Sequence, residues 1–329
     1  MKPRFRLEVS GRDITDAIAD RVLSIRVNDD AGQKSDTLDI TLDDRDQKVD
    51  VPSRRSTIKV WMGWDSSELA YLGQYTIDEV SIQMNPGQVK IRGKATTSAT
   101  YTTTKTRSWD NQTIGQIVST IAGEHGLIPS VHANYSERLV NHIDQENESD
   151  AHFLTRMAKI YGAVSKPADG RLLFIPEGQG ISTSGNTLAS ATVNSTELLT
   201  LRATVKDRGN YSSVITRYRD KETNQELEVT VEYAPGSFLG DGGVFRDKKL
   251  YTSRDMAEQA GQARLRQLAS GNISLDFTVR GRPDIFAERP VTLRGVRAPL
   301  ADEFIVKTVT HEFSGGGFTT KVSAGNKVS

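Results

Sequence analysis

Residues 38–42 read Leu-Asp-Ile-Thr-Leu and residues 275–279 read Leu-Asp-Phe-Thr-Val, so the second stretch repeats the first at an offset of 237. Two more matches follow in the same order, 58–60 with 291–293 at an offset of 233 and the hairpin 75–87 with 304–316 at an offset of 229. The kept order and the small one-way drift indicate a duplicated β-module with two shortened loops. We therefore expect residues 36–95 and 273–324 to superpose.

The same kind of alternation fills the N-terminal third of the chain. Leu23, Ile25 and Val27 alternate with polar residues, and turn-forming residues such as Asn85-Pro86-Gly87 separate the strands. Half-buried strands without a long helix predict a small antiparallel barrel or sandwich. The predicted fold is therefore mainly β with α+β insertions: a first barrel over 1–105, an α+β unit over 106–178 and a second barrel over 179–329.

Helical periodicity marks the middle unit and one insertion. Apolar residues at 114, 117, 118 and 121 predict a helix, and a second helix is expected from Ser149 to Gly162, followed by a hairpin that turns at Asp169-Gly170. Within the second barrel, the glycine-rich stretch 234–245 and a helix over 253–270 predict an inserted loop and helix at about 234–271, between strands at 226–233 and 273–279. The small apolar residues of that helix indicate close packing on a neighbour.

Composition excludes several classes of protein. The chain has 329 residues, 42 basic and 42 acidic, so its formal net charge is zero, which argues against a dedicated nucleic-acid binder and suits a protein that assembles. It has no cysteine, which excludes disulfides and thiolate metal sites. Neither a signal peptide nor a transmembrane run is expected, so we expect synthesis in a bacterial cytoplasm and no membrane insertion.

No residues are expected to carry catalysis. The five histidines lack metal-ligand spacing, no nucleophile elbow occurs, and Gly178-Gln179-Gly180 lacks the third glycine of a dinucleotide motif. A metal site near His142 and His152 is conceivable, but a polar loop capping the second helix is the favoured interpretation. The tryptophans at 61, 64 and 109 are expected to pack rather than to form a sugar-binding shelf. The prediction is no enzyme, no cofactor, no metal and no small-molecule substrate.

Three stretches resemble the late control D family, the central baseplate hub proteins of contractile phage tails and R-type tailocins. The first is Gln-Glu-Asn-Glu-Ser-Asp at 145–150 with Phe153-Leu154, Ala158, Gly162-Ala163 and Asp169-Gly170. The second is Tyr-Ser-Ser-Val at 211–214 with Arg-Tyr-Arg-Asp at 217–220, and the third is Val-Thr-His-Glu-Phe-Ser at 309–314 with Gly-Phe-Thr-Thr at 317–320. The first stretch is also similar to the N-terminal half of type VI secretion spike proteins. The resemblance covers some 180 residues in the right order.

That resemblance implies a homotrimer whose two barrels per chain form a pseudo-six-fold ring. One face would dock to the hexameric tail tube protein and the other would carry a trimeric central spike protein, with other baseplate proteins around it. Type VI spikes continue into a β-helical needle, whereas this chain stops at Ser329. We therefore expect the spike to be a separate protein and the particle to be a phage or a headless tailocin.

Two alternatives stay open beside the hub. One is a hub-like component of a type VI or related contractile injection system, and the other is a cell-wall hydrolase at a tail tip. For the hub, six identical tube sites require similar surfaces on the two barrels. The matched hairpins are therefore the candidate interface residues: Asn85, Pro86, Gly87, Ser314, Gly315, Gly316 and Gly317. Their short, glycine-bearing turns can lie close to a partner backbone.

Overall fold

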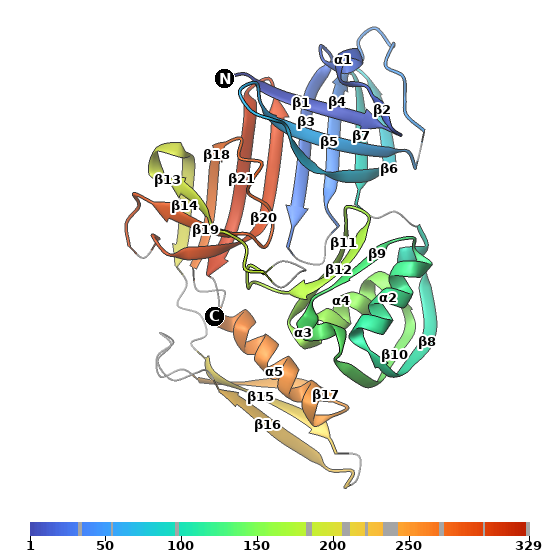
Figure 1. The fold of residues 1–329 in the computed structure, drawn as a ribbon, viewed down its shortest axis with the longest axis vertical. Coiled ribbons are helices and arrows are strands. Elements are labelled where there is room, and N and C mark those ends of the chain that lie inside the picture. The colour runs from blue at the N-terminus through green and yellow to red at the C-terminus, as the bar shows by residue number, and fades with distance from the viewer. Residues whose placement is uncertain are drawn as a thin grey trace.

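The computed structural model describes residues 1–31, 35–53, 55–95, 99–181, 186–205, 211–220, 223–232, 243–269, 273–298 and 300–326. A sheet of thirteen strands runs through its upper part, and smaller sheets with helices form its lower part (Figure 1). Within these residues, no helix combines the length and apolar character needed to cross a bilayer. The predicted fold class, mainly β with α+β insertions, is confirmed.

The first β-module occupies the N-terminal end of the large sheet. Its elements are β1 (Pro3–Val9), β2 (Arg12–Asp13), α1 (Thr15–Ile18), β3 (Val22–Asp30), β4 (Thr37–Asp43), β5 (Thr57–Trp64), β6 (Ala70–Met84) and β7 (Gly87–Lys94). They are ordered β3-β4-β7-β6-β5-β1-β2. Inward residues of β1 and β3 share one core although these strands are not paired, as Leu7 and Val27 illustrate. The sheet must therefore curl round that core.

The second β-module repeats this order. It contains β13 (Ala191–Asn194), β14 (Leu198–Val205), β18 (Ile273–Arg280), β19 (Pro290–Arg294), β20 (Glu303–Ser314) and β21 (Gly317–Asn326). Its order is β14-β18-β21-β20-β19-β13, which matches β3-β4-β7-β6-β5-β1 strand for strand. One difference stands at the end, since β13 runs parallel to β19 whereas β1 runs antiparallel to β5.

The strand registers support the duplication in detail. Ile58 lies opposite Tyr75 in the first module, and Val291 lies opposite Phe304 in the second, as the offsets of 233 and 229 require. A β-bulge follows Ile77 in β6, and another follows Val306, the residue 229 positions later, in β20. A shared irregularity is stronger evidence of common architecture than a shared alternation, because alternation is common to half-buried strands.

The sequence alignment needs two corrections. The duplication also includes β3 and β14, because a bulge after Val22 is repeated after Leu198, at an offset of 176. The matched hairpin is one residue pair longer in the second module, so the return strand is displaced by 231 rather than 229: Ile91 lies opposite Val80, and Val322 lies opposite Val309. The sequence alignment missed this difference because turn residues do not show how long the two strands of a hairpin are.

The two modules are joined edge to edge within the chain. β20 pairs with β19 through its first half and with β3 through its second half. Phe313 and Phe318, from the tip of the β20–β21 hairpin, pack onto the first module's core, with the Phe313 ring 4.9 Å from that of Phe5. The Trp64 indole N–H also donates to the Gly281 carbonyl at 2.9 Å. We call this join the seam.

The middle unit has the predicted helices and hairpin. It comprises β8 (Thr104–Thr113), α2 (Ile114–Glu124), β9 (Ile128–Val131), α3 (Ala133–Ser136), β10 (Leu139–Ser149), α4 (Asp150–Tyr161), β11 (Ala163–Ala168) and β12 (Arg171–Pro176). Thr113 and Gln116 form a capping box on α2, and Ser149 caps α4. Gly162 ends α4 with a left-handed φ of 63°, a conformation that glycine adopts without strain.

The inserted unit is larger than the predicted 234–271. β15 (Tyr211–Arg219), β16 (Glu226–Glu232) and β17 (Gly243–Tyr251) form a sheet of their own, and α5 (Arg254–Ala269) packs on it. The strand predicted at 226–233 as part of the second barrel therefore belongs to the insertion. Tyr251, Ala257 and Ala260 share a core with the middle unit, so this unit packs beside α4 in the lower part of Figure 1. Ser270 and Gly271, the predicted helix end, lie outside the described residues.

Candidate assembly surfaces

The two predicted hairpin turns lie at equivalent places in the two modules. Asn85 and Pro86 are the exposed turn between β6 and β7, and Gly315 and Gly316 are the exposed turn between β20 and β21. The surroundings differ, because the second turn lies next to the seam, whereas the first lies against Asp44 and Arg45, which follow β4. The structure thus places all seven predicted residues in or beside matched turns.

The glycines in these turns have internal roles. A side chain at Gly87 would come within 2.8 Å of the Arg45 Cα and the Asp44 carbonyl oxygen, so this glycine allows the turn to rest on its own module. Gly317 has a φ of 109°, which side chains other than glycine rarely adopt. Close approach to a partner is therefore not needed to explain Gly87 or Gly317. At Gly315 no atom lies within 4 Å of an added Cβ, so space remains there.

A buried ionic cluster joins three parts of the chain. The ammonium group of Lys166, on β11, lies 2.8 Å from Asp29 Oδ1 and 2.8 Å from Asp36 Oδ1 of the first module. The other Asp29 oxygen accepts the backbone N–H of Ala287, in the second module, at 2.7 Å. Next to Ala287, Glu288 Oε2 accepts the backbone N–H of Gly178, which follows the middle unit, at 2.8 Å. We call these groups the junction cluster.

The pKa values in the junction cluster follow from burial and charge. Burial raises the pKa of Asp36 to about 7, against the opposing effect of Lys166 and with a further rise from Asp29. Burial also acts to raise the pKa of Asp29, but the charge and hydrogen bond of Lys166 outweigh it and lower that pKa. For Glu288, burial raises the pKa to about 8, and the N–H of Gly178 only partly opposes this. The cluster therefore takes up protons near neutral pH.

We expect Glu288→Gln to flatten the pH dependence of stability. With a folded pKa of about 8 against an ordinary 4.5, Glu288 gives its full stabilisation at low pH, and this is lost as pH rises through 8. Glutamine keeps an acceptor for the Gly178 N–H and does not ionise. The variant's Tm relative to wild type should therefore rise between pH 5 and pH 9, in a thermal-melt series. Glu258→Gln, at an exposed site on α5, is the control, and parallel profiles for Glu288→Gln and wild type would contradict the prediction.

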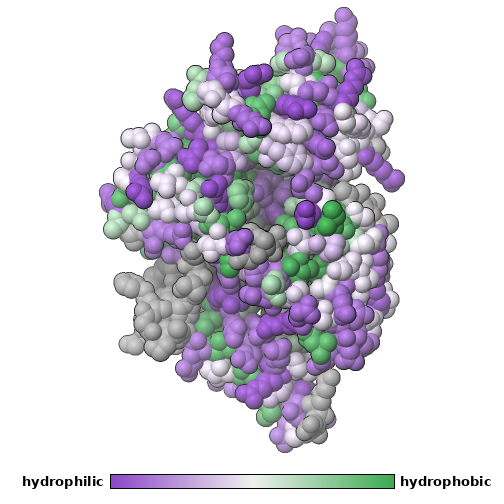
Figure 2. Space-filling model, viewed as in Figure 1, coloured by the Kyte–Doolittle hydropathy of each residue, from purple (hydrophilic) through white to green (hydrophobic). Residues whose placement is uncertain are grey.

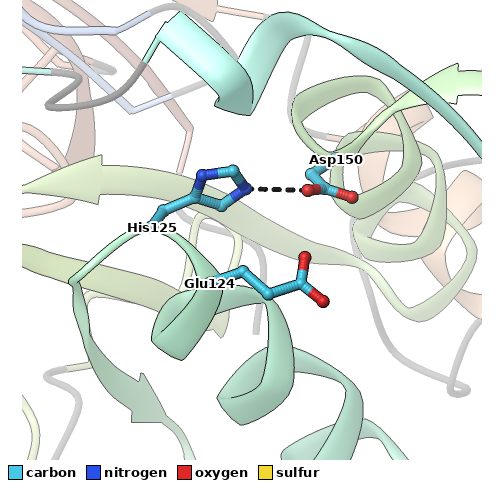
Figure 3. Close-up of side chains that lie close together, drawn as sticks. All are labelled: Glu124, His125 and Asp150. Atoms are coloured by element: carbon cyan, nitrogen blue, oxygen red, sulfur yellow. Dashed lines mark hydrogen bonds and ion pairs between the residues drawn. The ribbon is translucent and has the colours of Figure 1, made fainter.

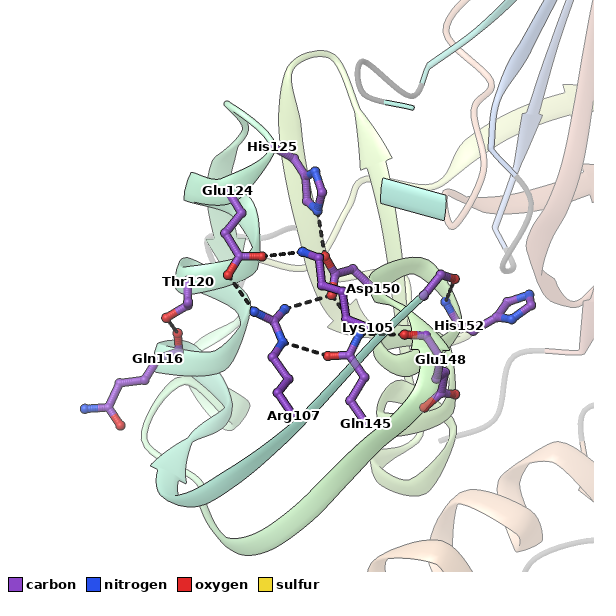
Figure 4. A network of polar contacts seen from close by, with 11 residues as sticks. Lys105, Arg107, Gln116, Thr120, Glu124, His125, Gln145, Glu148, Asp150 and His152 are labelled. Atoms are coloured by element: carbon purple, nitrogen blue, oxygen red, sulfur yellow. Dashed lines mark hydrogen bonds and ion pairs between the residues drawn. The ribbon is translucent and has the colours of Figure 1, made fainter. Parts of the chain in front are cut away.

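A second buried polar network centres on Asp150, the first residue of α4. Its side chain is fully buried, and its oxygens contact Lys105 Nζ at 2.6 Å, Arg107 Nη2 at 2.7 Å and His125 Nε2 at 2.7 Å (Figures 3 and 4). Gln145 donates a further bond at 2.8 Å. Burial acts to raise the pKa of Asp150, but hydrogen bonds from Lys105, Gln145 and His125, with the charge of Arg107, lower it.

Glu124, His125 and Asp150 have ligand atoms close enough to hold one ion. The oxygens of Asp150 are however already occupied by the four donors above, and Glu124 binds the same lysine and arginine at 2.7 and 2.6 Å. Two cations already fill the position at which a metal ion would balance these carboxylates, so the donor set fits a structural ion network better than a metal site. Sequence reasoning missed this grouping because Glu124 and Asp150 lie on different helices.

The histidines considered from the sequence do not come together. His142 is exposed and lies between Asp110, at 2.6 Å, and Asp144, at 3.1 Å. His152 is exposed, and its backbone N–H donates to Ser149 Oγ at the start of α4, as a capping loop would require. His311 is buried between Thr320 Oγ1 and the Ile285 carbonyl, and burial lowers its pKa to about 4, so it is a neutral packed residue.

The tryptophans pack as predicted. Trp109 is buried against Phe153, Trp64 lies at the seam beside Phe318, and Trp61 lies between Tyr71 and the guanidinium of Arg6. On the face drawn in Figure 2, hydrophilic residues predominate and hydrophobic ones form small separate groups. The described residues thus form a repeated sheet module held together by internal ionic junctions, with a matched turn on each copy.

Comparison with known proteins specifies which assembly. The family model for the phage tail baseplate hub (GPD) matches residues 87–317. The chain is 30% identical over 367 residues to the "Probable baseplate hub protein" of Escherichia phage 186, covering 100% of this chain and 94% of that protein. It is also 30% identical to the protein of that name in Escherichia phage P2, covering 98% and 92%. The chain belongs to the phage tail baseplate hub family.

Solved structures share the fold. The 43 kDa tail protein of prophage MuSo2 from Shewanella oneidensis matches with a TM-score of 0.71 at 15% identity, covering 99% of this chain and 98% of that one. A component of the type VI secretion system from E. coli matches with a TM-score of 0.56 at 13% identity, covering 100% and 77%. The resemblance to this family seen in the sequence is confirmed, and the chain is a baseplate hub protein of a phage tail.

Proposed function

We propose that the chain forms a homotrimer that joins the hexameric tail tube to a trimeric central spike. The repeated strand order of the two modules carries this proposal, because three chains with two similar modules each supply six similar modules to six identical tube subunits. Obligate rings of this kind bury well over about 1,000 Å² at each contact. The mass of the hub isolated from assembled baseplates tests the copy number, and two or six copies would contradict it.

The division of labour within the chain is part of the proposal. We assign tube docking to the first barrel, 1–105, together with its counterpart in 179–329, and we treat 106–178 as the α+β unit between them. The two copies expose matched turns at Asn85-Pro86-Gly87 and at Ser314-Gly315-Gly316-Gly317. These turns are the proposed tube-facing residues, and the other baseplate proteins would contact the remaining surface.

Lengthening either turn by three bulky residues should block tube assembly. Insertion between Asn85 and Pro86, or between Gly315 and Gly316, places side chains where the tube subunit would dock, whereas spike attachment should persist. The trimer should persist in the Gly315–Gly316 variant, whose turn lies beside the seam within one chain. Electron microscopy of tails and mass measurement of the hub give the two readouts. An insertion of equal length after Gly170, at the turn between β11 and β12, is the control. Normal tails from both turn variants would place the docking surface elsewhere.

The remaining assignments concern chemistry and location. We propose that the protein is structural and has no enzymatic activity or small-molecule substrate, that it is made in a bacterial cytoplasm and that it is incorporated into the tail of a phage or tailocin. The family's curated members are hub proteins, which supports this. Reproducible clearing of a peptidoglycan suspension by the purified protein would favour a hydrolase instead. A role in a type VI machine is the second candidate, supported by fold similarity alone.

A further inference from the structure

Among the described residues, the second half of β6 and the whole of β14 are strand segments with a ladder on one side only. β6 pairs with β5 only up to Thr76, and Ile77 then bonds with Arg55 and Ser56. In the part of the chain that the structure describes, residues 79–84 of β6 form a ladder only with β7, and β14 forms a ladder only with β18. Figure 1 places β14 and β6 on opposite sides of the large sheet. Exposed edges of this kind are templates for strand pairing.

These two edges are the duplicates of the two edges that meet at the seam. The second half of β20 pairs antiparallel with β3, so that Val309 to Phe313 lie opposite Asp29 to Ile25. The counterpart of that half of β20, 229 positions earlier, is the unpaired part of β6. The counterpart of β3, 176 positions later, is β14. The chain therefore carries one complete seam and the two separated halves of a second one.

We infer that β6 of one chain pairs with β14 of the next chain and so repeats the seam between subunits. This inference rests on the proposed trimer and specifies its contact. The expected register follows from the seam when 229 is subtracted from each β20 residue number and 176 is added to each β3 residue number. The result is an antiparallel ladder that includes these pairs: Val80 with Val205, Ser81 with Thr204, Ile82 with Ala203, Gln83 with Arg202 and Met84 with Leu201. The partner on each edge is a second copy of this chain.

The polar side chains fit this register. At the seam, Arg26 pairs with Glu312 at 3.1 Å, and the positions equivalent to them carry Arg202 and Gln83, an arginine facing a side-chain acceptor. Thr310 Oγ1 bonds to Asn28 at 2.9 Å, and the equivalent residues Ser81 and Thr204 are two hydroxyls that can bond each other. Complementary cross-strand pairs are thus kept at both positions although all but one of the residue types have changed.

The exposure of apolar side chains points to the same contact. Ile82 and Met84 lie on the core-facing side of β6, opposite Val89 and Gly87, yet they are 58% and 60% exposed. The residue equivalent to Ile82 in the second module is His311, which is only 2% exposed. The residue equivalent to Met84 is Phe313, which packs against the core of the first module. Val205, on β14, is 66% exposed. The core-facing side of the β20–β21 hairpin is thus covered by the first module of the same chain. The equivalent side of the β6–β7 hairpin is exposed among the described residues.

The contact is head to tail, because the two edges belong to opposite ends of one subunit. A heterologous contact of this type closes into a ring when its rotation divides a full turn. Since the subunit contact repeats the seam, the same strand pairing joins neighbouring modules inside one chain and in adjacent chains. Six modules from three chains would then be nearly equivalent, which is the property that docking to a six-fold tube requires.

Cysteine pairs test the register directly, because the natural chain has no cysteine. Gln83→Cys with Arg202→Cys places two thiols at exposed, directly opposite positions, at a Cα separation of about 5 Å that suits a disulfide. Tails are assembled under reducing conditions, oxidised with copper–phenanthroline and run on a non-reducing gel. The expected hub band is a covalent trimer, at three times the 36.2 kDa of one chain.

Two matched pairs calibrate this experiment. Arg26→Cys with Glu312→Cys is the same position at the seam and should close within one chain, leaving the hub at monomer mass. Gln83→Cys with Leu199→Cys is displaced by three residues, roughly 10 Å along the strand, and should give no cross-link. If the Gln83/Arg202 pair fails to assemble, Ser81→Cys with Thr204→Cys tests the next rung of the ladder. No trimer band while the seam pair closes would overturn the inference.

The outcome separates this inference from the proposed trimer. Three hub copies by mass without the cross-link would leave the trimer standing and disprove the β6–β14 pairing, whereas another copy number would disprove the trimer itself. A charge exchange gives a second readout. Gln83→Arg should weaken subunit association by about 1.5- to 5-fold per contact, since it faces Arg202, and adding Arg202→Glu should restore it. Equal association by all three proteins would also count against the pairing.

Discussion

Replacing Lys166 by methionine is expected to lower the free energy of unfolding by about 3–5 kcal/mol, because the buried carboxylates of Asp29 and Asp36 lose their cation. Methionine fills a similar volume, so the loss comes from charge rather than from a cavity. The Asp29 carboxylate also holds the Ala287 N–H, so the effect should extend to the contact between the modules. Chemical denaturation measures the free energy, and limited proteolysis reports any loosening between the middle unit and the sheet.

A rescue variant identifies the cause. Adding Asp36→Asn to Lys166→Met removes one of the two carboxyl groups that have lost their cation and should recover part of the lost stability. Lys159→Met, at an exposed lysine on α4, is the control for a change of net charge and should unfold like the wild type. Wild-type stability for Lys166→Met would show that the junction cluster does not hold the three parts together.

Asp150→Ala should destabilise the middle unit by a similar amount, about 3–5 kcal/mol. The substitution leaves Lys105 and Arg107 with one carboxylate, Glu124, and removes the partner of His125 Nε2 and one of the two acceptors of the Gln145 amide. The fully buried position gives water little access to replace these bonds. It also removes an acidic residue from the first turn of α4, where it interacts favourably with the helix dipole.

The measurement for Asp150→Ala is again equilibrium unfolding, with hydrogen exchange to locate the effect in α2, α4 and β8. Glu146→Gln changes an exposed acid four residues earlier and should have little effect. A selective loss of protection around α4 with the large sheet unchanged would agree with the local role described here. An unchanged unfolding midpoint for Asp150→Ala would show that the network contributes little to stability.

Several elements could be predicted because their signals are local. The alternation at 38–42 and 275–279 indicated half-buried strands, and the repeated order of such strands indicated the duplication that the registers support. Helix α2 was predicted from its own apolar stripe, and the ends of α4 were predicted closely from Ser149 and Gly162. The seven turn residues were found for the same reason, since turn chemistry lies in consecutive residues.

Other features depend on which surfaces meet. The stretch 211–232 reads as strands in either sheet, and only packing against α5 and the middle unit places it in the insertion. Nothing in the alternation of β20 distinguishes its first half, which pairs with β19, from its second half, which pairs with β3. Members of the Asp150 network such as Lys105, Glu124 and Asp150 are also too far apart in sequence to form a motif.

The sequence by itself determined the β-rich class, the repeated module, the helices and the turns, because side-chain periodicity states which face of each element must leave water. Only the tertiary structure decided what covers those faces: the seam between β3 and β20 and the junction of Lys166 with Asp29. It also decided that, among the described residues, the second half of β6 and β14 have a ladder on one side only. The physical reason is that the tendency of a side chain to leave water depends on that residue alone, whereas the pairing of two strands depends on two surfaces. The local sequence pattern of one strand does not say which other surface will cover it.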